Sequence, residues 1–351
     1  SRVLDLGAVP AADHFPAVSD PVRAGEACHP LAMDLCLDCA LAQLAEDDTV
    51  TSEPRGVEPQ ALRDQAADAV ERVARAGLLD GDTVREFGSP HGGSWLPDLA
   101  QRGIRETAGP ADIVLDCFGI MHEPDQRAAF DVRAAATAGD GVLLLQYHEL
   151  SAIIRQGQWN ALRHGHFSYY SAPAVTGLLA AAGMRVVASW RFDLYGGTVL
   201  VAARHGAGDT DAAMAERVLA ERDLGTPAAF AGLQQSADGD TAALRAWLRR
   251  QNTAGERVYA YGAASRAVAL FARAGLDRGL LAAVADAAPA KQGRRMPGTD
   301  IEIISPSQLV EAAPGRVVLT LPDLLPEVSA QLPQLAGRWV TMDAVLADAT
   351  G

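Results

Sequence analysis

The chain has 351 residues, a formal net charge of -14 and 49% hydrophobic residues. This length allows two domains and a small N-terminal module, and the acidic charge argues against nucleic acid or an anionic membrane as a partner, since both repel acidic surfaces. The sequence contains neither an apolar run of about 18 residues nor a basic-then-apolar N-terminal signal, so we expect a cytoplasmic protein.

Residues 1–55 form the first expected unit, and three of the four cysteines lie in it. Cys36 and Cys39 have the Cys-x-x-Cys spacing of half a zinc site, and Cys28 together with His29 could complete it. Because a structural zinc site needs four ligands, two reduced thiols in a small core are the alternative interpretation. Both interpretations stay open at this point.

Residues 56–205 alternate between helical and strand patterns, which predicts an α/β domain. A helical stretch precedes GDTVREFGS, which is typical of a strand that enters a glycine turn. The apolar runs ADIVLDCFG and GVLLLQYHE have the length of strands buried on both faces. Tyr147 and His148 end the second run, where open α/β sheets place their ligands, so we expect them to bind substrate.

Residues 206–255 have the pattern of a helical bridge, and residues 256–351 return to alternating strands and helices. Asp286 ends the second strand of this section, at about the distance expected for a ribose-binding acid. The following loop, APAKQGRRMPGT, is basic and suits a diphosphate. We therefore expect nucleotide-binding residues here, namely Gly262, Arg266, Asp286, Lys291 and Arg294.

Motifs of one family recur along nearly the whole chain. They include VLDLGAVPAADHFP with PLAMDLCLDCALAQL, EFGSPHGG, NALRHGHFSYYSAPAVTGLLAAAGMRVV, YGGTVLV, AYGAASRAVAL and VADAAPAKQGRRMPGTDIEIISP. In this order they resemble the zinc module, cofactor loop, active-site segment, GGS turn and C-terminal domain of the nucleotide-sugar C-methyltransferases of deoxysugar biosynthesis. Members of that family methylate a carbon next to the ketone of a TDP-4-keto-6-deoxyhexose with S-adenosylmethionine, and they commonly have Lys at the position of Arg266.

The resemblance also implies the fold class. We expect an α/β protein in which a reduced class I methyltransferase-like domain, itself Rossmann-like, is followed by a second Rossmann-like domain. A small N-terminal module of zinc type precedes both. The expected boundaries are those of the four sections above.

The cofactor loop of the family is only partly retained. The retained positions are Glu86, Gly88 and Gly92. Pro90-His91 replaces the family's Asn-Asp pair, and the stretch 93–112 is shorter than the roughly 30 residues of a βαβ unit. Glu106 is the only acid of the RETAGP connection, and we expect it in a turn with no strand before it. The sequence thus predicts a degenerate site that no longer binds S-adenosylmethionine, and the alternative is a compacted site that still does.

The family's YHEH active-site segment aligns with Arg163, His164, Gly165 and His166, so its tyrosine and glutamate are lost. A histidine of near-neutral pKa can remove a proton beside a ketone, and an arginine can contact a diphosphate or an enolate oxygen. The resemblance therefore assigns His166 as the base, with His164 and Arg163 as further catalytic candidates.

These features predict a methyltransferase-like enzyme that binds a nucleotide-linked keto-sugar and moves protons on it, by epimerisation, isomerisation or elimination, without methyl transfer. One alternative is a sugar C-methyltransferase that uses S-adenosylmethionine in a compacted site. Another is a non-catalytic protein that binds a partner enzyme. Expected partners are a nucleotide sugar or related small molecule, and either a partner enzyme or further copies of the chain.

Overall fold

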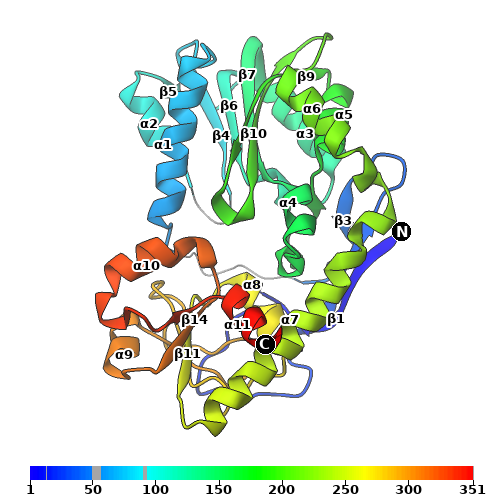
Figure 1. The fold of residues 1–351 in the computed structure, drawn as a ribbon. Coiled ribbons are helices and arrows are strands. Elements are labelled where there is room, and N and C mark those ends of the chain that lie inside the picture. The colour runs from blue at the N-terminus through cyan, green and yellow to red at the C-terminus, as the bar shows by residue number, and fades with distance from the viewer. Residues whose placement is uncertain (13, 50–56, 90–92, 351) are drawn as a thin grey trace.

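A computed structural model describes residues 1–12, 14–49, 57–89 and 93–350. Two α/β units lie one above the other in Figure 1, and the long helix α7 (Ala231–Thr253) runs down one side toward the lower unit. None of the described helices is long and apolar enough to cross a membrane.

A small antiparallel sheet holds the N-terminal segment. In sheet order its strands are β1 (Arg2–Pro10), β2 (Cys28–Leu35), β3 (Ala42–Leu44) and β8 (Ser168–Tyr169). Strand β8 belongs to the sequence of the upper unit and pairs with β3. The N-terminal segment is therefore joined to the upper unit by backbone hydrogen bonds.

The upper unit is built on a sheet in which four parallel strands are followed by an antiparallel pair. In sheet order the strands are β5 (Arg105–Glu106), β4 (Thr83–Phe87), β6 (Ala111–Cys117), β7 (Thr137–His148), β10 (Thr198–His205) and β9 (Met184–Phe192). The α-helices of this region are α1 (Gln60–Arg75), α2 (Leu96–Gln101), α3 (Gln126–Ala136), α4 (Leu150–Arg155), α5 (Ala172–Ala181) and α6 (Ala212–Ala220). Short 3-10 helices are η1 (Ile120–His122), η2 (Trp159–Ala161), η3 (Leu194–Gly196), η4 (Arg222–Gly225) and η5 (Pro227–Phe230).

Both faces of the upper sheet are covered by helices. Successive side chains of a strand point to opposite faces. Ile113 and Leu115 of β6 therefore pack with the helices α1 and α2, whereas Val114 packs with α3, α5 and α6. Figure 1 shows the two groups of helices on either side of the sheet. This arrangement explains why the central strands β6 and β7 contain uninterrupted apolar runs, at 113–115 and 142–145.

Glu106 lies in strand β5 and not in a turn, which corrects the expectation from the sequence. The strand has two residues and pairs in parallel with Thr83 and Val84 at the beginning of β4. Two residues carry no periodic pattern, so the strand could not be recognised beforehand. Glu106 is level with Val84 and therefore lies well before the carboxyl end of β4 at Phe87.

The lower unit contains a parallel sheet. In sheet order its strands are β13 (Ile303–Ile304), β12 (Val284–Ala285), β11 (Val258–Tyr261), β14 (Arg316–Leu319) and β15 (Trp339–Val340). Its helices are α8 (Ser265–Arg273), α9 (Pro306–Glu311), η6 (Pro322–Leu324), α10 (Leu325–Gln331), η7 (Pro333–Leu335) and α11 (Met342–Thr350). Numbered within the unit, the strand order is 3-2-1-4-5, which is the order of a Rossmann fold.

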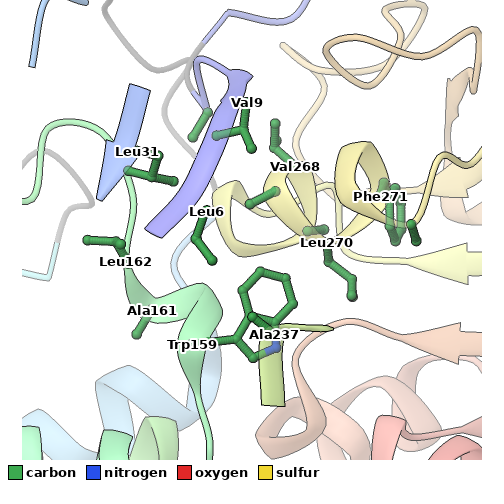
Figure 2. Close-up of a cluster of buried hydrophobic side chains, with 14 of the residues drawn as sticks. Leu6, Val9, Leu31, Trp159, Ala161, Leu162, Ala237, Val268, Leu270 and Phe271 are labelled. Atoms are coloured by element: carbon green, nitrogen blue, oxygen red, sulfur yellow. The ribbon is translucent and has the colours of Figure 1, made fainter. Parts of the chain in front are cut away.

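The N-terminal segment and the lower unit share one hydrophobic core. Leu6 and Val9 of β1 belong to it together with Val268 and Leu270 of α8. Figure 2 shows these side chains in one cluster, with Leu6 and Leu270 nearer than Val9 to the indole ring of Trp159. The fold class expected from the sequence is confirmed: an α/β protein with two Rossmann-like units and a small N-terminal module. The domain boundaries expected after residues 55, 205 and 255 stay predictions.

Candidate functional site

A cavity of about 260 Å³ lies between the carboxyl ends of the parallel strands of the upper and lower sheets. The upper sheet contributes Ser89, which follows β4, and Phe118, which follows β6. The lower sheet contributes Gly262, which follows β11, and Leu321, which comes after β14. In each sheet these two neighbouring strands are the point where the strand order reverses, and open α/β sheets bind ligands at that point. Two switch points thus face one cavity.

Positive charge gathers on one wall of this cavity, at the N-terminus of α8. Arg163 lines the wall, and its Nη1 donates a hydrogen bond to Ser265 Oγ. Arg266 also lines it, and its Nη1 donates to Gln158 Oε1 at 3.5 Å. Burial and the neighbouring charge of Arg163 lower the pKa of Arg266 to about 10. Two guanidinium groups beside a helix N-terminus are a suitable receptor for an anion.

Asp286 lines the cavity directly after β12. Its Oδ2 accepts a hydrogen bond from Ala263 N and its Oδ1 accepts one from Ala288 N, both at 2.8 Å. Lys291 fixes the same turn from the other side, because its Nζ donates to Ala263 O at 3.0 Å. Its ammonium also lies 4.9 Å from the ring centroid of Phe15, so a residue of the N-terminal segment helps to place it.

Gly262 is the residue of this turn that needs to be glycine. Its φ is 98°, and a Cβ at this position would collide with Thr320 Oγ1. The missing side chain leaves the backbone open to a ligand at the switch point of the lower sheet. The structure thus brings Gly262, Asp286 and Lys291 together with Arg266 around one turn.

His148 lines the opposite wall, at the carboxyl end of β7. Its ring is stacked on Phe118, with 4.8 Å between the ring centroids. Phe118 has a positive φ of 64°, and the turn after it is held by Asp116 Oδ1, which accepts from the backbone N–H groups of Gly119 and Ile120. Asp116 is fully buried and pairs with Arg133 Nε at 2.9 Å. A buried ion pair therefore shapes the turn that supports His148.

Arg163 lines the cavity, and His166 lies behind it. The side chain of His166 is 3% exposed, and its Nε2 accepts a hydrogen bond from Arg163 Nε at 2.8 Å. His122 packs against it, with 4.4 Å between the ring centroids. His164 lies further away, where its Nε2 is 3.0 Å from Pro30 O, and burial lowers its pKa. Of the three expected catalytic residues, Arg163 alone is among the described residues that line the cavity.

Two other expected binding residues also lie off the described cavity wall. Tyr147 is 1% exposed and belongs to the core between the upper sheet and its helices. Arg294 is exposed, and its Nη1 donates to Phe15 O at 2.7 Å while its Nε donates to Ala290 O at 2.9 Å. Arg294 therefore joins the basic loop to the N-terminal segment.

The expected cofactor loop begins with Glu86 and Gly88, and Gly92 lies outside the described residues. The carboxylate of Glu86 accepts from Ser94 Oγ at 2.6 Å and from Trp95 N at 2.9 Å, so it holds the start of α2. Next to this loop, the hollow lined by Trp95, Cys117 and Phe118 has a volume of only about 10 Å³. Trp95 is 2% exposed and belongs to the hydrophobic core that β4 and β6 share with α1 and α2.

Cys36 and Cys39 lie together after β2, and the backbone N–H groups of Cys39 and Asp38 lower the pKa of Cys36. Within the described ranges, no group of three or more His, Cys, Asp or Glu side chains could hold a metal ion. Cys28 begins β2 and lies roughly 25 Å from Cys36 at about 3.3 Å per residue, which corrects its assignment to the same site. The two thiols supply half of a zinc site, and bound zinc stays a prediction.

Several cavity residues were not anticipated from the sequence. They are Glu58, Phe118, Tyr195, Tyr261, Leu321, Leu324, Glu327, Val328 and Gln331. Most of them carry no motif. Tyr195 had one usable signal, since it precedes the two glycines of the YGG turn, where positive φ angles are common.

Comparisons with known proteins agree with the motifs. Residues 193–342 match the model of the C-methyltransferase C-terminal domain. The C-methyltransferase NovU of Streptomyces niveus is 27% identical over 93% of this chain and 88% of its own length.

Among solved structures, an O-methyltransferase family protein from Burkholderia thailandensis is 16% identical, with a TM-score of 0.29 over 42% of this chain and 58% of that chain. Magnesium protoporphyrin IX methyltransferase from Synechocystis PCC 6803 is 14% identical, with a TM-score of 0.30 over 40% of this chain and 83% of that chain. Because both TM-scores are low, the assignment of the fold rests on the strand order described above. The sequence matches extend over both α/β units, and they support the resemblance of the chain to the C-methyltransferase family.

Proposed function

We propose that this protein binds a nucleotide-linked keto-sugar in the cavity between the two sheets and moves a proton next to its ketone, without transferring a methyl group. The observation that carries the proposal is the cavity itself, which has two arginines beside the N-terminus of α8 and a histidine at the carboxyl end of β7. Resemblance to sugar C-methyltransferases supplies the substrate class.

The lower unit suits the nucleotide. Asp286 occupies the strand end at which Rossmann folds bind a ribose, and Gly262 opens the neighbouring turn. Arg163 and Arg266 flank the N-terminus of α8, where a diphosphate would receive both charge and backbone N–H groups. This placement points the sugar toward His148 in the upper unit.

His148 is the group best placed to remove the proton. A base has to reach the substrate, and His148 lines the cavity while His166 lies behind Arg163. The Nε2 of His166 is also engaged, because it accepts a hydrogen bond from Arg163 Nε. We assign His166 the task of holding Arg163, and its role as the base stays the prediction of the family resemblance.

The methyl donor fits poorly at the upper switch point. An adenosine needs space beside β4 and an acid at the carboxyl end of the next strand. The hollow of about 10 Å³ beside Trp95 is water-sized. The one acid on the adjacent strand, Glu106, is level with the beginning of β4. Both observations support a protein that has given up S-adenosylmethionine.

The first test is calorimetry of the purified protein with TDP and, separately, with S-adenosylhomocysteine. We expect binding of TDP and none of S-adenosylhomocysteine. The second test follows deuterium uptake from D2O into a TDP-4-keto-6-deoxyhexose by mass spectrometry, against a blank without protein. Uptake is expected with the wild type, and its absence despite TDP binding would leave a non-catalytic binding protein.

Three variants locate the base. His148→Gln should slow deuterium uptake at least about 100-fold while the TDP affinity stays within a factor of about two. His166→Gln should weaken TDP binding, because Arg163 loses its support. His205→Gln is the control, since His205 ends β10 far from the cavity end of that strand. Normal uptake in His148→Gln together with none in His166→Gln would return the role of base to His166.

Methyl transfer is the second candidate, and one observation favours it. Ser89 of the cofactor loop lines the same cavity as His148, so a donor bound there would face the substrate. The relative NovU is itself named a C-methyltransferase. Binding of S-adenosylhomocysteine, or incorporation of a labelled methyl group, would make this the leading function.

A further inference from the structure

Tyr195 lines the cavity from the turn between β9 and β10. Its backbone has φ 57° and ψ 30°, the left-handed conformation that costs energy for a bulky residue. Gly or Asn would adopt this conformation at lower cost, so the turn alone does not explain a tyrosine. Backbone strain of this kind collects at functional sites, where the surrounding structure holds it.

The strained turn is held by both α/β units. From the upper unit, Gln156 Nε2 donates to Gly196 O at 2.6 Å, and Glu149 N donates to Gly197 O at 3.1 Å. From the lower unit, the carboxylate of Asp323 accepts hydrogen bonds from the backbone of Tyr195 and Gly196. Contacts on both sides thus hold the backbone of the turn that carries the Tyr195 ring.

The phenol lies among the groups of the proposed reaction. Its ring centroid is 5.7 Å from that of His148. Burial raises the pKa of Tyr195, so the phenol is protonated near neutral pH, while the charges of Arg266 and Arg163 act in the opposite direction. Those two cations would stabilise a phenolate once the proton has left. A protonated phenol beside cations is suited to act as a general acid.

We infer that Tyr195 is the general acid of the reaction and that it donates its proton to the ketone oxygen of the substrate. The inference rests on the proposed function. As the imidazole of His148 takes the α-proton, the electron pair of the C–H bond becomes the carbon–carbon double bond of an enol. The π pair of the ketone then takes the proton of Tyr195. Return of both protons regenerates the ketone, and delivery to the other face of the carbon gives the epimer.

Tyr195→Phe tests the inference because it removes the hydroxyl and keeps the ring. We expect deuterium uptake into a TDP-4-keto-6-deoxyhexose to fall by at least about 100-fold, with the Kd of TDP within about twofold of the wild type. The rate that remains should lose the alkaline decline that titration of the phenol gives the wild type. Tyr259→Phe is the matched control, since Tyr259 is a buried tyrosine of β11 that does not line the cavity.

The outcomes separate the inference from the proposed function. If the wild type takes up deuterium and Tyr195→Phe does so at the same rate, the acid role is overturned and the proposed function stands. Loss of TDP binding in Tyr195→Phe also overturns the acid role, because the phenol would then serve binding. If the parent protein binds TDP and exchanges no deuterium, the proposed function itself is wrong.

Discussion

Replacing Arg266 by glutamine should stabilise the ligand-free protein and weaken its binding of TDP. The charged side chain is held in an unfavourable place, since burial and the charge of Arg163 lower its pKa from 12.5 to about 10. At about 1.4 kcal/mol for each pH unit, this corresponds to roughly 3 kcal/mol against the charged form. Loss of packing by the arginine stem offsets part of the gain. We therefore expect the free energy of unfolding to rise by about 1 kcal/mol.

Binding should change in the opposite direction. Hydrogen bonds between a guanidinium and a phosphate contribute about 1.5–3 kcal/mol, so the Kd of TDP should rise roughly 10- to 100-fold. Urea unfolding without ligand and calorimetry with TDP measure the two effects on the same protein. Arg278→Gln is the control, because it removes the same charge from a side chain of the same unit that is 55% exposed.

Two results would refute this reasoning. A wild-type Kd of TDP in Arg266→Gln would show that the diphosphate does not bind at the N-terminus of α8. A loss of stability without ligand would show that Arg266 is supported by partners stronger than its contact with Gln158 at 3.5 Å. Arg278→Gln should leave the free energy of unfolding and the Kd of TDP close to their wild-type values, apart from the long-range effect of removing one unit charge.

Three further predictions concern the support of the site. Trp95→Ala removes a buried indole and should lower the free energy of unfolding by about 3–5 kcal/mol in urea titrations, without creating affinity for S-adenosylhomocysteine in calorimetry. Arg133→Met leaves Asp116 buried without its cation and should cost about 3–5 kcal/mol in the same titrations, and adding Asp116→Asn should restore most of the loss. Burial lowers the pKa of His164 below its usual 6.5, so the unfolded chain takes up a proton first as the pH falls. The stability that His164 contributes is therefore lost as the pH falls through about 6.5, and thermal midpoints of His164→Gln should depend less on pH than those of the wild type.

The fold was largely predictable because its strands are buried on both faces. The segments ADIVLD and GVLLLQY contain uninterrupted apolar runs at 113–115 and 142–145, and each segment became a central strand of the upper sheet. Strand β5 escaped prediction because it has two residues. The packing of the N-terminal segment on α8 escaped it as well, since a periodic pattern gives the apolar face of an element and not the identity of its partner.

The site was predictable where a residue ends a parallel strand. His148, Gly262 and Asp286 all follow from that rule and line the cavity. The assignment of His166 rests on alignment with the family, and alignment does not show that Arg163 lines the cavity in its place. Tyr195 was missed because its position depends on a left-handed turn and on contacts from Asp323 of the other unit.

The two switch points impose a limit on the chemistry. A methyltransferase of this architecture needs two ligands, a donor at the upper sheet and a substrate that reaches it from the lower sheet. If Trp95 and the short strand β5 exclude the donor, one molecule spans both switch points. The reaction must then convert this one molecule without a second reactant, apart from protons exchanged with side chains and water. Epimerisation, isomerisation and elimination beside a ketone meet this condition, and each begins with the proton transfer assigned to His148.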